Sequence, residues 1–156
     1  MKNQKVFVYG TLKTNEPNHH WLTKPENGYS RLIGIGATRV KYPLIIGTKY
    51  NIPFLLHSPG NGHHVKGEVY EVDAKMMCNL DVLEDHPNYY VREIDDIVMI
   101  DKSGLIRCWV YFIKTFNPSL LHKPALEDYS SKGAHGLEYK ERSQRDPNYD
   151  HKKELL

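Results

Sequence analysis

The chain has 156 residues, 40% hydrophobic and 26% charged, a balance typical of one globular domain. Its net charge of +2 is small, and its Lys and Arg residues are scattered until the end of the chain, which argues against a nucleic-acid partner. No apolar run is long enough to span a membrane, and Met1–Lys5 leads into a strand rather than a signal peptide. Cys78 and Cys108 lie in apolar stretches, so we predict two buried, reduced thiols and a cytoplasmic (cytosolic) protein.

The first half of the chain is predicted to consist mainly of short strands separated by turns. A short helix is expected around His19–Leu22. The β-favouring segments are Lys5–Tyr9, Arg31–Val40, Tyr42–Ile46, Tyr50–His57 and Val65–Val72. Pro43 and Pro53 favour sheet edges or bulges. Whether Pro53 follows a cis peptide bond, which would shape a pocket wall, stays open at this point.

The second half contains the clearest helix signal, from Asp73 as N-cap to Asp85, with Pro87 just beyond it. Extended segments are expected at Tyr89–Ile94, Ile97–Ile100 and Leu105–Phe112, the last two joined as a hairpin, and a short helix within Pro118–Asp128. We therefore predict an α+β fold, a small mixed or antiparallel β-barrel with flanking short helices, over residues 1–142. Residues 143–156 are polar and charged, and they are predicted to form a flexible tail.

The run VFVYGTLK, residues 6–13, is the first candidate for a functional loop. A strand ends there in Gly10, where bare backbone can turn sharply and approach a ligand. Successive N–H groups in such a turn can form an anion-binding nest. The alternative is that Gly10 serves the turn alone.

Glu84 is the second candidate, because helical geometry places it on an apolar face. At about 100° per residue, Glu84 falls between Leu80 and Met77, whereas Asp81 and Asp85 fall outside this arc. Burial raises the pKa of a carboxyl group, and acids with shifted pKa values concentrate at functional sites. The alternative is that Glu84, at the helix end, reaches solvent or pairs with Arg92.

Several segments together resemble the gamma-glutamylcyclotransferase-like family, which includes the plant avirulence-induced-gene-2-like group. VFVYGTLK is similar to the family's N-terminal signature. Five further segments resemble one branch of this family, the gamma-glutamylamine cyclotransferases: YPLIIG, NIPFLLHSPGNG, VKGEVYEVD, LDVLEDHPNYYVR and YSSKGAHGLEY. The resemblance runs in order from about Val6 to Arg142.

The resemblance implies a catalytic glutamate at Glu84 and a substrate-binding loop formed by Tyr9, Gly10, Thr11 and Leu12. The implied reaction is an attack by the substrate's own α-amine that releases 5-oxoproline and a free amine, lysine being the expected one. It implies a small gamma-glutamyl substrate as the partner and neither cofactor nor metal. Two alternatives are a cyclotransferase acting on gamma-glutamyl amino acids or peptides, and a non-catalytic ligand-binding module of the same fold.

The remaining polar and aromatic residues give weaker signals. The adjacent pairs His19–His20 and His63–His64 do not have the spacing of a zinc site. His135 is a candidate for the pocket wall but is more typical of a bystander in a loop. Tyr89 and Tyr90 are expected to straddle a strand, one facing inward and one outward.

Overall fold

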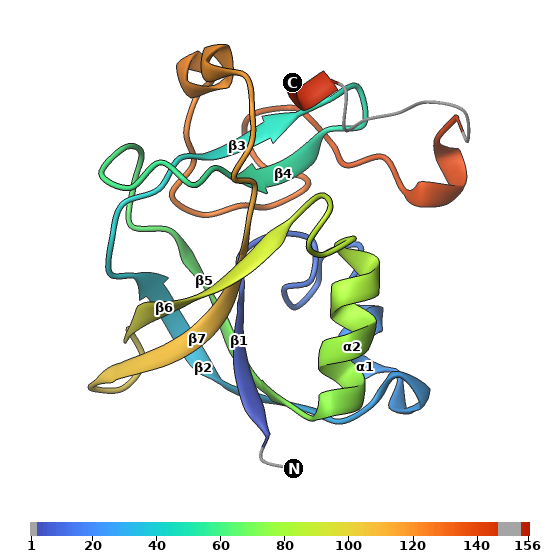
Figure 1. Ribbon diagram of the computed structural model, residues 1–156, viewed down its shortest axis with the longest axis vertical. Helices are drawn as coiled ribbons and strands as arrows, with labels where there is room; N and C mark the ends of the chain where they lie inside the picture. Colours follow the sequence, from blue (N-terminus) through green and yellow to red (C-terminus); the bar gives the residue numbers. More distant parts are fainter. Residues whose placement is uncertain (1–2, 147–153) are drawn as a thin grey trace.

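The computed structural model describes residues 3–146 and 154–156, and it contains a closed five-stranded barrel (Figure 1). Around the barrel the strand order is β1 (Gln4–Val8), β5 (Lys66–Val72), β2 (Ser30–Thr38), β6 (Val91–Met99) and β7 (Leu105–Phe112). Neighbours pair antiparallel except β1 and β7, whose parallel contact closes the barrel at Val6 and Trp109. The predicted mixed barrel with short helices is confirmed.

The strand β1 is apolar because both of its faces are covered. Val6 and Val8 belong to the cluster that packs against α2 (Ala74–Leu83), whereas Phe7 belongs to a second cluster with Val69. Alternation along the strand sends successive side chains to opposite faces of the sheet. A strand buried on both sides therefore leads directly to the turn at Gly10.

A second, smaller sheet lies above one end of the barrel in Figure 1. It pairs β3 (Leu44–Gly47) with β4 (Ile52–Leu55) in antiparallel fashion, so Pro53 lies opposite Ile46. Among the described residues the one cis peptide bond is His86–Pro87, and the bond before Pro53 is trans. The short helices are α1 (His20–Thr23), η1 (Pro25–Asn27), η2 (Pro118–His122) and η3 (Arg142–Gln144).

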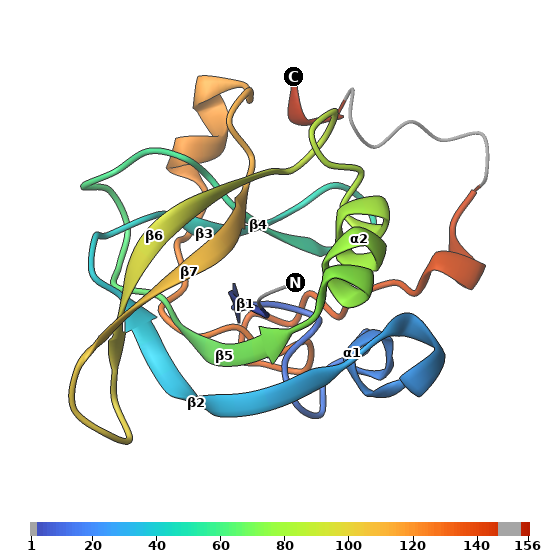
Figure 2. The same ribbon diagram turned by 60° about the horizontal axis from the view of Figure 1, so that its bottom comes forward.

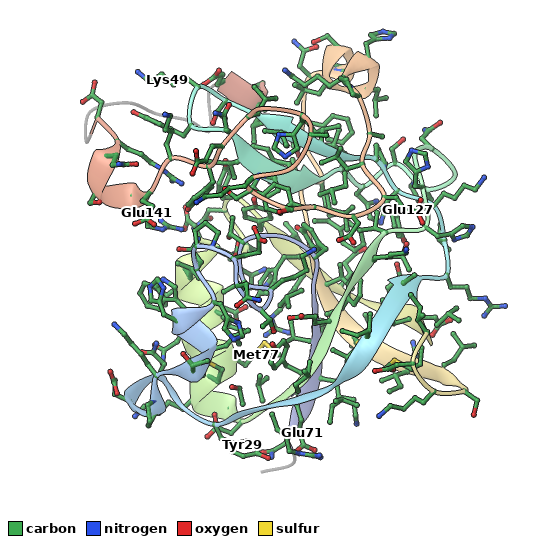
Figure 3. All side chains as sticks on the ribbon, turned by 180° about the vertical axis from the view of Figure 1, so that it is seen from behind. Tyr29, Lys49, Glu71, Met77, Glu127 and Glu141 are labelled. Atoms are coloured by element: carbon green, nitrogen blue, oxygen red, sulfur yellow. The ribbon has the colours of Figure 1, made fainter. Side chains whose placement is uncertain are left out.

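The helix α2 lies along the side of the barrel, near α1 (Figure 2). Its first turn is capped as predicted, since the Asp73 carboxylate accepts a hydrogen bond from the Met76 N–H at 2.9 Å. Met76, Met77 and Leu80 are buried against the barrel, and Figure 3 shows Met77 within the packed interior. No helix in the described part of the chain is long and apolar enough to cross a membrane.

Three sequence-based expectations differ from the structure. Cys108 is buried, but Cys78 is exposed because it faces away from the apolar side of α2. The two predicted strands on either side of Asp95 are one continuous strand, β6. Tyr89 and Tyr90 precede that strand, and both line the cavity described below instead of facing opposite ways.

The predicted tail differs from a free chain where the structure describes it. Leu155 is buried, and its carbonyl accepts a hydrogen bond from the Asn117 N–H at 2.7 Å. The Arg145 guanidinium lies over the rings of Tyr50 and Tyr139. The rest of the predicted tail, residues 147–153, lies outside the described residues. The domain boundary at residue 142 stays a prediction.

The side chain of Asp81 ties α2 to the barrel. Its carboxylate accepts two hydrogen bonds from Arg92, at 2.8 and 3.1 Å, and one from the Tyr111 hydroxyl at 2.7 Å. The Arg92 guanidinium also stacks over the Trp109 ring, 4.2 Å from its centroid. These partners come from β6 and β7, so one carboxylate fixes the second half of α2 against two strands.

We predict that Asp81→Ala lowers the free energy of unfolding by about 2 kcal/mol, because it removes a charged acceptor from two partly buried donors. In a double-mutant cycle with Arg92→Ala, we expect a coupling energy of about 1 kcal/mol from urea denaturation. Additive effects of the two substitutions would show that this ion pair does not hold the helix.

Candidate functional site

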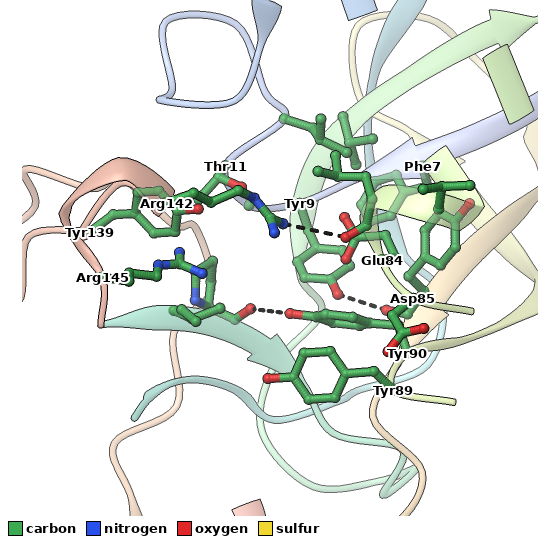
Figure 4. A pocket seen from close by; sticks show the side chains of 18 residues that line it. Phe7, Tyr9, Thr11, Glu84, Asp85, Tyr89, Tyr90, Tyr139, Arg142 and Arg145 are labelled. Carbon is green, nitrogen blue, oxygen red and sulfur yellow. Dashed lines mark hydrogen bonds between the residues drawn. The ribbon is translucent and has the colours of Figure 1, made fainter. Parts of the chain in front are cut away.

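A cavity of about 250 Å³ lies where the end of β1, the end of α2 and the C-terminal segment meet (Figure 4). All five residues singled out from the sequence line it: Tyr9, Gly10, Thr11, Leu12 and Glu84. They come from two elements far apart in the chain. The wall is completed by aromatic and apolar side chains from β4 and the segment before β6, namely Ile52, Pro53, Tyr89 and Tyr90.

The turn after β1 presents unpaired backbone donors at this cavity. The N–H groups of Gly10, Thr11 and Leu12 donate to no acceptor among the described residues. A Cβ atom at position 10 would lie 3.0 Å from Pro53 Cγ, so glycine permits the close approach of this turn to β4. Three successive free N–H groups can bind a carboxylate or an oxyanion.

The loop that carries these donors is held by Asn18. The backbone N–H of Asn18 donates to the Thr11 carbonyl at 2.8 Å. Its side-chain amide lies 3.0 Å from both the Thr11 hydroxyl and the Tyr139 hydroxyl. Asn18 is buried, so these bonds replace water and link the loop after β1 to the C-terminal segment.

Glu84 is placed at the cavity by the way in which α2 ends. The N–H of Asp85 donates to the Val82 carbonyl, and the N–H of His86 donates to the Asp81 carbonyl. With Asp85 in the left-handed conformation (φ 51°), this is the bonding pattern of a Schellman stop. Glu84 is the C-cap and directly follows Leu83, the last residue of the helix.

The carboxylate of Glu84 has no hydrogen bond or ion pair with any residue in the described part of the chain. The sequence left pairing with Arg92 open, but Arg92 binds Asp81 instead. Burial raises the pKa of Glu84 from 4.5 to about 7, and the nearby charge of Arg142 lowers it by a smaller amount. Near neutral pH this group can therefore both accept and donate a proton.

Two buried tyrosine hydroxyls near Glu84, those of Tyr9 and Tyr90, donate hydrogen bonds to backbone carbonyls. Tyr9 donates to the Tyr111 carbonyl at 2.6 Å, and Tyr90 donates to the Pro53 carbonyl at 3.1 Å. Burial and the charge of Glu84 raise the pKa of both phenols well above 10, so they stay protonated. They act as cavity walls, which leaves Glu84 as the group that titrates near neutral pH there.

The sequence analysis missed Tyr139, Arg142 and Arg145, which also line the cavity. They lie in or just before the predicted tail, where no periodic pattern points to a buried side. His135 does not line the cavity: its Nε2 contacts the Ser130 carbonyl at 2.8 Å, and its ring stacks on Tyr129. Within the described residues, no group of three or more His, Cys, Asp or Glu side chains is placed to hold a metal ion.

Comparison with known proteins places these features in a family context. The family model described as "Gamma-glutamyl cyclotransferase, AIG2-like" matches residues 6–131. The Bos taurus gamma-glutamylaminecyclotransferase is 45% identical over 140 residues, covering 90% of this chain and 83% of that protein. The Drosophila melanogaster protein CG2811 is 56% identical over 125 residues, covering 80% of this chain and 79% of that protein. The crystal structure of an AIG2-like protein from Mus musculus is 39% identical, covers 93% of this chain and 100% of that one, and has a TM-score of 0.89.

We predict that Glu84→Gln stabilises the protein at high pH. The folded state binds an extra proton between pH 4.5 and about 7, so the free energy of unfolding of the parent protein falls as Glu84 ionises across that range. The full loss corresponds to roughly 3 kcal/mol at 1.36 kcal/mol per pKa unit. Chemical denaturation should therefore show that Glu84→Gln raises the free energy of unfolding more at pH 8 than at pH 4, by a similar amount. An equal increase at both pH values would contradict a raised pKa for Glu84.

Proposed function

The chain belongs to the gamma-glutamyl cyclotransferase, AIG2-like family, and we propose that it releases 5-oxoproline and a free amine from gamma-glutamylamines. One observation carries the proposal: a carboxylate whose pKa is raised by burial shares a cavity with three backbone N–H groups, and neither the carboxylate nor the N–H groups have a partner among the described residues. The first is suited to proton transfer and the second to binding negative charge. Relatives named gamma-glutamylaminecyclotransferase support the same reaction class.

In the proposed reaction the nucleophile is the α-amine of the substrate's own glutamyl group. The amine reacts in its neutral form: Glu84, as carboxylate, takes one of its two protons, and the amine nitrogen forms a bond to the γ-carbonyl carbon. The bond from that carbon to the leaving nitrogen then breaks, and Glu84 returns its proton to the departing amine. Atoms and charge balance without an enzyme nucleophile, and an intramolecular attack of this kind can reach effective molarities of ~10⁵ M when well oriented.

The backbone N–H groups of Gly10, Thr11 and Leu12 hold the negative charge of the glutamyl group in this scheme. Depending on the pose, they bind its α-carboxylate or the oxyanion that develops on the γ-carbonyl oxygen. One preorganised hydrogen-bond donor to such an oxyanion typically lowers the activation free energy by about 3 kcal/mol. The tyrosine walls exclude water, which strengthens both interactions.

We further propose an ε-lysine amide of glutamate as the substrate, such as the isopeptide left when crosslinked proteins are digested. The names of the mammalian relatives support an amine leaving group, and the cationic side chains at the cavity suit a substrate that carries carboxylates. The cytoplasm stays the proposed location.

Replacing Glu84 with Gln should lower kcat for 5-oxoproline release by at least about 10³-fold, because the amide keeps the shape but cannot accept the proton. In the parent enzyme, kcat/KM should rise with pH and level off above about 7 as Glu84 ionises. A coupled assay for 5-oxoproline measures both.

Circular dichroism and a melting curve serve as the control that Glu84→Gln is folded. A folded variant with near-normal turnover would refute the role of Glu84 as base and acid. The exposed acid Glu26, outside the cavity, provides a matched Glu→Gln substitution that we expect to leave the rate unchanged.

A substrate panel tests the leaving group. We expect gamma-glutamyl-ε-lysine to be converted with a kcat/KM at least about 100-fold above that for glutathione or for gamma-glutamyl-alanine, measured as 5-oxoproline release. The reverse order would assign the protein to gamma-glutamyl amino acids or peptides. Tight binding of 5-oxoproline without turnover of any member of the panel would indicate a binding module.

A further inference from the structure

The cavity has a second set of donors besides the backbone N–H groups, two cationic side chains that take no part in the bond-making and bond-breaking steps proposed above. Arg142 and Arg145 line it from the C-terminal segment, as Figure 4 shows together with Tyr139. Neither guanidinium forms an ion pair with a carboxylate among the residues that the structure describes. Two arginines that line a cavity without an ion pair to any described carboxylate suit an anionic ligand.

Arg145 is held in a fixed orientation. Its Nε donates to the Lys140 carbonyl at 3.0 Å. Its guanidinium lies 5.0 Å from the ring centroid of Tyr139 and 5.3 Å from that of Tyr50. Such stacking orders the planar group and leaves its edge available for hydrogen bonds in the ring plane.

One nitrogen of this arginine lacks a partner. The Nη2 atom of Arg145 is inaccessible to solvent and makes no hydrogen bond within residues 3–146 and 154–156. A buried donor is rarely left unsatisfied, because desolvation costs free energy that no bond returns. A ligand carboxylate would satisfy it, and a guanidinium edge matches the two oxygens of such a group.

The position of the two arginines indicates which carboxylate this is. Arg142 donates to the Leu83 carbonyl at 3.3 Å, at the end of α2, and its charge lowers the pKa of Glu84. Arg145 instead contacts the Lys140 carbonyl and the rings of Tyr50 and Tyr139, and no hydrogen bond or ion pair joins it to α2 among the described residues. The α-carboxylate of the glutamyl group is only two bonds from the attacking nitrogen, whereas a carboxylate on the leaving amine lies several bonds beyond the scissile bond.

We infer that Arg145, with Arg142 beside it, binds a carboxylate on the leaving amine, so that the enzyme selects gamma-glutamyl derivatives of amino acids over those of simple amines. This inference rests on the proposed function. It makes residues 142–145 a specificity element, although they lie at the boundary of a segment that the sequence suggested to be a flexible tail. The chemical class recognised is an amino acid joined through its side-chain amine.

Two substrates that differ by one group provide the test. Gamma-glutamyl-ε-lysine and gamma-glutamylcadaverine have the same chain and the same terminal amine, but only the first carries the leaving-group carboxylate. We expect the parent enzyme to favour the lysine derivative at least 10-fold in kcat/KM. In Arg145→Gln this ratio should fall at least 10-fold, mainly through a higher KM for the lysine derivative, and Arg145→Lys should restore part of it.

Arg31→Gln is the matched control, since Arg31 is an exposed arginine on β2 outside the cavity, and we expect it to keep the parent ratio. An equal loss on both substrates in Arg145→Gln, or an unchanged ratio, would overturn the inference while leaving the cyclotransferase activity intact. If the parent enzyme releases 5-oxoproline from neither substrate, the proposed function itself is wrong, and the inference fails with it. A melting curve for each variant verifies folding.

Discussion

The site depends on keeping the carboxyl group of Glu84 half-buried at the cavity, with no hydrogen-bond or ion-pair partner among the described residues. Such a group destabilises the fold whenever it is ionised, so the surrounding structure must supply the free energy to keep it there. The apolar side of α2 does this by packing Met76, Met77 and Leu80 against the barrel. The hydrogen bonds of Asp81 with Arg92 on β6 and Tyr111 on β7 also stabilise the position of α2, one turn before Glu84.

Most of the polar groups in and around the cavity have hydrogen-bond partners within the described part of the protein, and a few do not. The phenols of Tyr9 and Tyr90, the amide of Asn18 and the carboxylate of Asp81 all have partners. The groups without described partners include those to which the proposed reaction and the inferred subsite assign a role: the Glu84 carboxylate, the N–H groups after β1 and one nitrogen of Arg145. Native proteins satisfy nearly all buried polar groups, so such a concentration at one place marks a ligand site.

Sequence reasoning succeeded where a regular period governs the structure and failed where tertiary contacts do. The helical period placed Glu84 on the apolar face, and the strand ending in Gly10 located the loop. The prediction for Cys78 was wrong because it relied on an apolar neighbourhood instead of the helix face. The predicted gap between Ile94 and Ile97 was wrong, because the Asp95 side chain accepts a hydrogen bond from the Tyr42 hydroxyl and is accommodated in β6.

The arginines of the C-terminal segment could not be found in this way. Residues 139–146 have neither a helical nor a strand period, and contacts such as Tyr139 with Asn18 and with Ser131 bring them back to the barrel. Long-range hydrogen bonds of this kind leave no local pattern in the sequence. A polar composition alone therefore did not distinguish a segment that lines a cavity from one that is solvated throughout.

The parallel seam between β1 and β7 has a consequence for how the protein is made. Of the five barrel strands, β1 is synthesised first, and its neighbours β5 and β7 both follow much later in the chain. Until they emerge, an apolar strand has two open edges, which favours intermolecular association. Contacts of such high sequence separation also slow folding. We expect the barrel to close only after β7 has emerged from the ribosome, with β1 as the segment most in need of protection beforehand.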